Sequence, residues 1–122
     1  MTDFQQVADR YIATWNEMEP RARRAAIEAL WAEDGRYVDP VAAVRGHDEI
    51  DSTIAAVQAR FPGFAFRLAG AVDGHHQQCR FGWELGPAES QLAPIAGSDV
   101  AMLDADGRLT AVLGFLDRLP PN

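Results

Sequence analysis

Three polar residues occupy positions where the sequence pattern calls for apolar ones, and groups of their kind can transfer protons. Tyr11 lies in an apolar helical stripe, Asp39 ends a short strand, and Asp99 lies in a strand with apolar residues on both faces. A buried tyrosine needs a partner for its hydroxyl. A carboxyl group buried among apolar side chains has a raised pKa, because its charged form loses hydration. Such groups can act as general acids and bases.

Each of these residues also has a purely structural interpretation. Tyr11 fits a core tyrosine bonded to a backbone carbonyl, and Asp39 before Pro40 is typical of a turn. Asp99, which follows Gly97 and Ser98, fits a solvated residue at the start of a strand or a residue at a sheet edge. The residues by themselves leave both interpretations open.

Four aromatic residues lie in elements that we expect to face one another. They are Trp15, Trp31, Trp83 and Phe115. Core packing explains each of them singly. Together with Tyr11, they could also line a pocket for a flat, apolar small molecule.

Helical periodicity dominates the first half of the chain. Apolar residues recur at helical spacing from Phe4 to Trp15, and Thr2 with Gln5 has the pattern of a capping box. Two further helices are expected, Arg21–Ala32 after Pro20 and about Asp48–Phe61, and the short segment Arg36–Asp39 between them is expected to form a strand.

After Gly63 the period changes to two, which is typical of half-buried strands. Asp73-Gly74 predicts a hairpin turn, and a second hairpin is expected to pair Ser98–Leu103 with Leu109–Leu116. Helices followed by antiparallel strands indicate an α+β fold. Glycines inside the strands permit bends, so the sheet is expected to curve over the helices into a cone with an interior: Gly70, Gly82 and Gly114.

The composition is that of a globular protein and excludes several partners. With 122 residues, the chain suits one domain over 1–122, and its net charge of −7 repels nucleic-acid phosphates. No apolar run reaches the roughly 20 residues that cross a bilayer. The absence of a signal-peptide pattern and the single Cys79, expected to be buried, predict a cytoplasmic location.

No metal site or cofactor is expected. His75 and His76 are adjacent, so on a strand they point to opposite faces and cannot share one ion. The sequence has no glycine-rich phosphate loop and no G-x-S-x-G nucleophile motif.

Six segments, in order along nearly the whole chain, carry a family resemblance. They are Arg10–Asn16, Trp31–Pro40, Arg45–Ile50, Gly97–Val100, Asp106–Leu109 and Gly114–Asp117. The sequence resembles the SnoaL-like branch of the nuclear transport factor 2-like superfamily. That resemblance implies a cystatin-like cone, in which three N-terminal helices are wrapped by a curved antiparallel sheet. It also implies an internal ligand pocket and frequent homodimers.

One type of member, the bacterial ketosteroid isomerases, implies roles for the three polar residues. The general base of these enzymes falls on Asp39 here, and the two donors of their oxyanion hole fall on Tyr11 and on a protonated Asp99. Proton abstraction next to a carbonyl needs an ionised carboxylate and donors for the developing enolate oxygen. Whether Asp39 or Asp99 is the base stays open.

Three functions are therefore considered. The first is proton transfer alpha to a carbonyl of an apolar substrate, in an isomerase or a polyketide-cyclase-like aldol closure. The second is a non-catalytic module that binds an apolar metabolite or a second subunit. The third is epoxide-hydrolase-like activation of water, which needs an arginine between two carboxylates, and no Arg-x-Asp occurs at Asp99.

Overall fold

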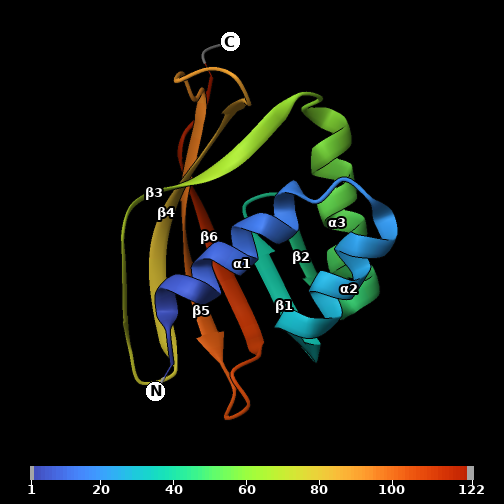
Figure 1. Ribbon diagram of the computed structural model, residues 1–122, viewed down its shortest axis with the longest axis vertical. Helices are drawn as coiled ribbons and strands as arrows, with labels where there is room; N and C mark the ends of the chain where they lie inside the picture. Colours follow the sequence, from blue (N-terminus) through green and yellow to red (C-terminus); the bar gives the residue numbers. More distant parts are fainter. Residues whose placement is uncertain (1, 121–122) are drawn as a thin grey trace.

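The computed structural model describes residues 2–120 and begins with a helical layer. Helix α1 spans Phe4–Asn16, α2 spans Pro20–Leu30 and α3 spans His47–Arg60. Figure 1 shows α1 crossing one face of the sheet, with α2 and α3 beside it next to the first two strands. Among the described residues no helix is long and apolar enough to cross a membrane.

Two details of the helical layer differ from the sequence expectation. The cap of α1 is Asp3, whose carboxylate accepts the Gln6 backbone N–H at 3.0 Å, so the predicted pairing of Thr2 with Gln5 is wrong. Helix α2 ends at Leu30 rather than at Ala32. Trp31 is already the first residue of a strand, and its side chain is buried in the core with 1% exposed. The sheet therefore begins where the helix was expected to continue.

A single six-stranded sheet forms the second layer. Its strands are β1 (Trp31–Asp39), β2 (Ala42–Arg45), β3 (Phe64–His75), β4 (Gln78–Pro87), β5 (Ile95–Leu103) and β6 (Leu109–Arg118). Their order is β2-β1-β6-β5-β4-β3. All neighbours are antiparallel except β1 and β6, which run parallel. The α+β prediction is confirmed, with this one parallel pair added because the first long strand enters beside the last.

The first hairpin turns later than predicted. Asp73 and Gly74 lie within β3, paired with Arg80 and Cys79, and the turn consists of His76 and Gln77. A side chain at Gly74 would approach the Phe4 ring to 2.6 Å. This glycine therefore permits close packing of α1 on the sheet rather than a turn.

The register of the sheet shifts next to two of the three glycines predicted to permit bends, Gly70 in β3 and Gly82 in β4, whereas Gly114 is paired regularly. Gly70 has a φ of 81°, and it lies where the register between β3 and β4 shifts. A side chain at Gly82, on the adjacent strand, would lie 3.0 Å from the Ala69 carbonyl oxygen. The resulting bend carries β3 across the upper end of the molecule toward α3 (Figure 1). The helices and the bent sheet thus enclose an interior that their side chains only partly fill.

Hydrogen bonds fix the end of α1 against the sheet and against α3. The Asn16 side chain donates to the Phe66 carbonyl and accepts the Phe66 N–H, both at 2.8 Å. The Gln58 amide donates to the carbonyls of Trp15 and Glu17. These contacts hold Trp15, the penultimate residue of α1, in a defined position over the interior.

Candidate active site

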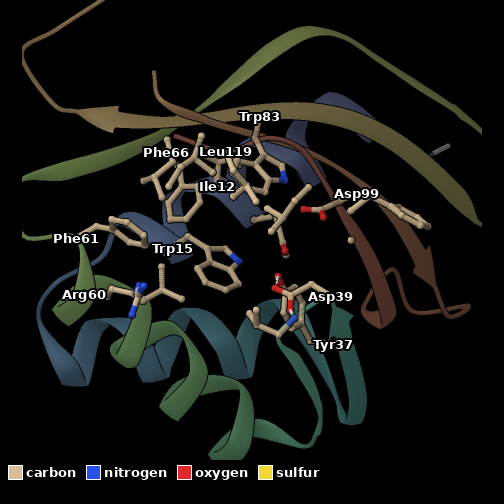
Figure 2. A pocket seen from close by; sticks show the side chains of 18 of the residues that line it. Ile12, Trp15, Tyr37, Asp39, Arg60, Phe61, Phe66, Trp83, Asp99 and Leu119 are labelled. Carbon is tan, nitrogen blue, oxygen red and sulfur yellow. Dashed lines mark hydrogen bonds between the residues drawn. The ribbon is translucent and has the colours of Figure 1, made fainter. Parts of the chain in front are cut away.

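A cavity of about 620 Å³ lies between the helices and the concave face of the sheet. Figure 2 shows aromatic side chains along its walls and two aspartates, Asp39 and Asp99, at one end. The sequence-predicted site residues that line it are Tyr11, Trp15, Asp39, Trp83, Asp99 and Phe115. Trp31 is not among the lining residues. Its indole packs in the core, with its ring centre 6.5 Å from that of Tyr11.

Asp99 is presented to the cavity by the alternation of β5. The odd-numbered residues of this strand are buried and the even-numbered ones lie outward, which leaves Asp99 only 3% exposed. Its partner across the ladder is Gly114 on β6. A side chain at Gly114 would come within 2.6 Å of the Asp99 Oδ1. The bare glycine thus provides the space that the buried carboxyl group occupies, and the solvated interpretation of Asp99 is wrong.

The surroundings of Asp99 favour its protonated form. Burial raises the pKa of the Asp99 carboxyl to about 7, and the negative charges of Asp39 and Asp117 add to the rise. Hydrogen bonding from Trp83 and Tyr11 lowers the pKa of Asp99, but by less than burial raises it. Near neutral pH this carboxyl group can therefore donate as well as accept a proton.

Asp39 is fixed by hydrogen bonds at the turn between β1 and β2. Its Oδ1 accepts the backbone N–H groups of Val41 and Ala42, both at 2.8 Å, and its Oδ2 accepts the Tyr37 hydroxyl at 2.6 Å. The carboxylate closes the turn and faces the cavity at the same time. The structural and the functional interpretations of Asp39 are thus compatible.

Asp39 and Asp99 approach each other across the bare backbone of Gly114. A Cβ atom added at Gly114 would lie 2.6 Å from the Asp99 Oδ1 and 3.4 Å from the Asp39 Cβ. Residues 60 positions apart in the sequence meet here because β6 lies between β1 and β5 in the sheet. Two carboxyl groups in different surroundings therefore share one end of the cavity.

Two buried tyrosines complete this polar end. Burial raises the pKa of Tyr11 well above its ordinary value, and the nearby Asp99 charge raises it further. Burial likewise raises the pKa of Tyr37, as does its hydrogen bond to Asp39. Both phenols are therefore neutral donors. Tyr37 was not among the sequence-predicted site residues, although its spacing of two from Asp39 on a strand places both side chains on one face.

The remaining walls are apolar and largely aromatic. The Phe66 ring bridges the indoles of Trp15 and Trp83, with ring centres 5.3 Å apart in each pair. Aliphatic side chains fill the space between the rings: Ile12, Val57, Leu85, Ile95 and Leu116. Phe115 lies at the margin of the cavity, since its side chain is 60% exposed. A flat, apolar molecule would match these walls.

The histidines and the cysteine do not contribute to this cavity. The rings of His75 and His76 lie at the β3–β4 turn, with their Nδ1 atoms 3.0 Å apart, and Cys79 is buried. Within residues 2–120, no group of three His, Cys, Asp or Glu residues could hold a metal ion. The carboxyl and phenol groups that line the cavity can accept and donate protons.

Comparison with solved structures supports both the fold and the family. A "putative isomerase of the SnoaL-like family" from Agrobacterium tumefaciens is 40% identical, with 96% of this chain and 99% of that one covered and a TM-score of 0.90. An "NTF2-like protein of unknown function" from Exiguobacterium is 20% identical, with 91% and 98% covered and a TM-score of 0.72.

A third solved structure resembles the chain at lower identity. It is a "putative SnoaL-like polyketide cyclase" from Jannaschia, 15% identical, with 96% of this chain and 90% of that one covered and a TM-score of 0.70. No curated protein has a sequence that matches this chain. The model of the SnoaL-like domain family matches residues 8–112. The chain belongs to the SnoaL-like domain family.

Proposed function

We propose that this protein is an enzyme that removes a proton from the carbon next to a carbonyl group of an apolar substrate. The observation that carries the proposal is the pair of aspartates at one end of an apolar cavity, where Asp39 accepts three hydrogen bonds and Asp99 is held by burial near its neutral form. Two carboxyl groups whose surroundings separate their protonation states are suited to serve as base and acid.

In this mechanism Asp39 is the base, and Tyr11 and protonated Asp99 are the donors. The substrate C–H proton passes to the Asp39 carboxylate, and the electron pair of that bond moves to the carbonyl oxygen as an enolate. Tyr11 and Asp99 stabilise the negative oxygen by hydrogen bonds. Asp39 then returns its proton at another carbon, which gives an isomer. Alternatively, the enolate carbon attacks a second carbonyl, which closes a ring, and the alkoxide that forms there takes the proton from Asp39.

Tyr37 would act as a positioning residue for this base. It donates to the Asp39 Oδ2 at 2.6 Å, while the backbone of the turn holds Oδ1. A carboxylate oxygen has more than one lone pair, so Oδ2 keeps acceptor capacity for a substrate proton. The relatives described as an isomerase and as a polyketide cyclase are consistent with either outcome of the enolate.

Exchange of hydrogen for deuterium tests the proton abstraction without knowledge of the product. Apolar cyclic ketones would be incubated with the protein in D₂O, and loss of the alpha-proton signal would be followed by NMR. We expect exchange above the buffer rate and a loss of roughly 10²–10⁴-fold in Asp39→Asn. Asp106→Asn, which changes an exposed aspartate in the turn between β5 and β6, away from the cavity, is the matched control. Equal rates in wild type and Asp39→Asn would contradict the proposal.

Binding without catalysis is the second candidate, and the apolar walls favour it. It predicts that an apolar ketone or phenol binds, and that Asp39→Asn leaves both the affinity and the background exchange unchanged. The third candidate, epoxide opening by activated water, has less support. Arg60 is the one basic side chain among the described cavity residues, and it does not lie between the two aspartates (Figure 2).

We also propose that the protein forms a homodimer through the outer face of β5 and β6. Val100 pairs with Leu113 across these strands, Met102 is exposed nearby, and Phe115, at the margin of the cavity, extends the apolar patch. Exposed apolar side chains in one patch are typical of an interface. Sedimentation of the wild type as a dimer and of Phe115→Asp as a monomer would support this, and a monomeric wild type would refute it.

A further inference from the structure

The end of the cavity opposite the two aspartates carries a positive charge. Arg60 is the last residue of α3 and lines the cavity together with Val57 and Phe61. Figure 2 shows Arg60 at one side, Asp39 and Asp99 at the other, and the Trp15 indole between them. A molecule that spans the cavity would therefore meet carboxyl and phenol groups at one end and a guanidinium at the other.

Arg60 has no protein partner for its charge within residues 2–120. Five other arginines form ion pairs with carboxylates there: Arg23, Arg24, Arg67, Arg80 and Arg118. The Arg60 guanidinium instead lies over the Phe61 ring, with its Cζ 5.8 Å from the ring centre. An anion that binds Arg60 would therefore displace no carboxylate.

Charge also determines how an elongated anion would lie in the cavity. The chain carries a net charge of −7, and Asp39 and Asp99 are acidic groups at the inner end. The Asp39 carboxylate repels an anion, whereas Arg60, exposed at the opposite end of the cavity, attracts it. A ligand with one charged end would thus bind in a single orientation, with its uncharged end next to the aspartates.

We propose that Arg60 determines substrate class, and that the substrate is an apolar carbonyl compound with a carboxylate at the end remote from its carbonyl. The assignment of the carbonyl to the aspartate end rests on the proposed function. The carboxylate would accept hydrogen bonds from the guanidinium, a pairing whose fork geometry gives both strength and direction. The apolar middle of the molecule would contact Trp15 and Phe66.

A cation in the last turn of a helix also stabilises that helix, so the test must separate recognition from folding. Two flat phenols provide the probe: 2-naphthol, and 6-hydroxy-2-naphthoate, which adds a carboxylate at the far end. Their affinities would be measured by calorimetry for the wild type, Arg60→Gln, Arg60→Lys and Arg108→Gln. Arg108 is exposed in the β5–β6 turn, so its replacement removes the same charge away from the cavity.

We expect the carboxylate to bind the wild type about tenfold more tightly than 2-naphthol, with the difference lost in Arg60→Gln. Arg60→Lys should restore part of it, and Arg108→Gln should change nothing. The preference should also weaken as salt is added, because screening acts only on the charged ligand. A helix-stabilising role alone would lower the affinity for both phenols together and would overturn the proposal.

The same titrations in Tyr11→Phe and Asp99→Leu, each of which removes a hydrogen-bond donor, distinguish this proposal from the proposed function. If both phenols bind equally and only these two variants weaken them, Arg60 has no recognition role and the proton-transfer site stands. If the carboxylate depends on Arg60 but neither phenol depends on Tyr11 or Asp99, anion recognition stands and the oxyanion site is refuted. Failure of both phenols to bind the wild type would refute both.

Discussion

The turn after β1 and the middle of β5 each present one aspartate to the same cavity, but the two regions treat the carboxyl group differently. At the turn, two backbone N–H groups and the Tyr37 hydroxyl donate to Asp39. In the strand, Asp99 lies against the bare backbone of Gly114, and burial raises its pKa to about 7. Two residues of the same type thus have different surroundings, a hydrogen-bonded turn for Asp39 and a buried strand position for Asp99.

This difference underlies the proposed pairing of a base, Asp39, with an acid, Asp99, in one cavity. A carboxylate that accepts several hydrogen bonds is stabilised in its charged form, whereas a carboxyl group in apolar surroundings is stabilised in its neutral form.

Replacement of Asp99 should separate a donor from a base. Asp99→Leu removes the hydrogen-bond donor, and we expect alpha-proton exchange to fall roughly 10²–10³-fold, the effect of losing one oxyanion donor. Asp99→Asn keeps an N–H donor, so its rate should stay within about tenfold of the wild type. NMR exchange rates for both variants provide the measurement. Similar, near-complete losses in the two variants would instead identify Asp99 as the base.

The raised pKa of Asp99 should also appear in the pH dependence of stability. Between its ordinary pKa near 3.8 and about 7, the folded protein holds one more proton at Asp99 than the unfolded chain does. The free energy of unfolding therefore falls as pH rises through this window and levels off above it. Asp99→Asn removes this contribution, so the variant should gain about 3 kcal/mol relative to the wild type between pH 4 and pH 8.

The free energy of unfolding would be measured with urea at a series of pH values. The difference between the wild type and Asp99→Asn isolates the contribution of this one group. Other titrating residues contribute equally to both proteins and cancel. A difference that is flat across the window would mean that Asp99 titrates normally, and the contrast between the two regions would disappear.

Periodicity predicted most of the fold, because apolar spacing reports which face of an element is buried. The stripe from Phe4 to Trp15 and the alternation from Phe64 to Leu68 correspond to α1 and β3. Local turn signals were less reliable. Asp73-Gly74 has a strong hairpin pattern, yet Gly74 is needed where the Phe4 ring packs on the strand. That requirement is a tertiary contact, which the local sequence does not encode.

The candidate site was predictable as single residues but not as an arrangement. Tyr11, Asp39 and Asp99 are distinctive because each interrupts an apolar pattern. Their convergence depends on β6 pairing with both β1 and β5, and strand order is not visible in a local pattern. In the sequence, Arg60 resembles any arginine at a helix end, and only the cavity gives it a possible role. Trp15 and Trp31 are both buried, but of the two only Trp15 lines the cavity. The roles of these residues stay predictions.

The smallest of the expected effects concerns the hydrogen bond that supports Asp39. Tyr37→Phe removes the donor to Oδ2 and leaves both backbone donors to Oδ1 in place. We expect a loss of about 1 kcal/mol in the free energy of unfolding and a fall of about fivefold in exchange rate, because the carboxylate keeps its position but gains freedom to rotate. Val38→Ala, on the opposite face of β1, provides a control for stability alone, since its side chain does not line the cavity.

If Tyr37→Phe were as inactive as Asp39→Asn while it stayed folded, the phenol itself would take part in the reaction. Tyr37 would then be an acid of the reaction, beside Asp99, and not only a residue that positions Asp39.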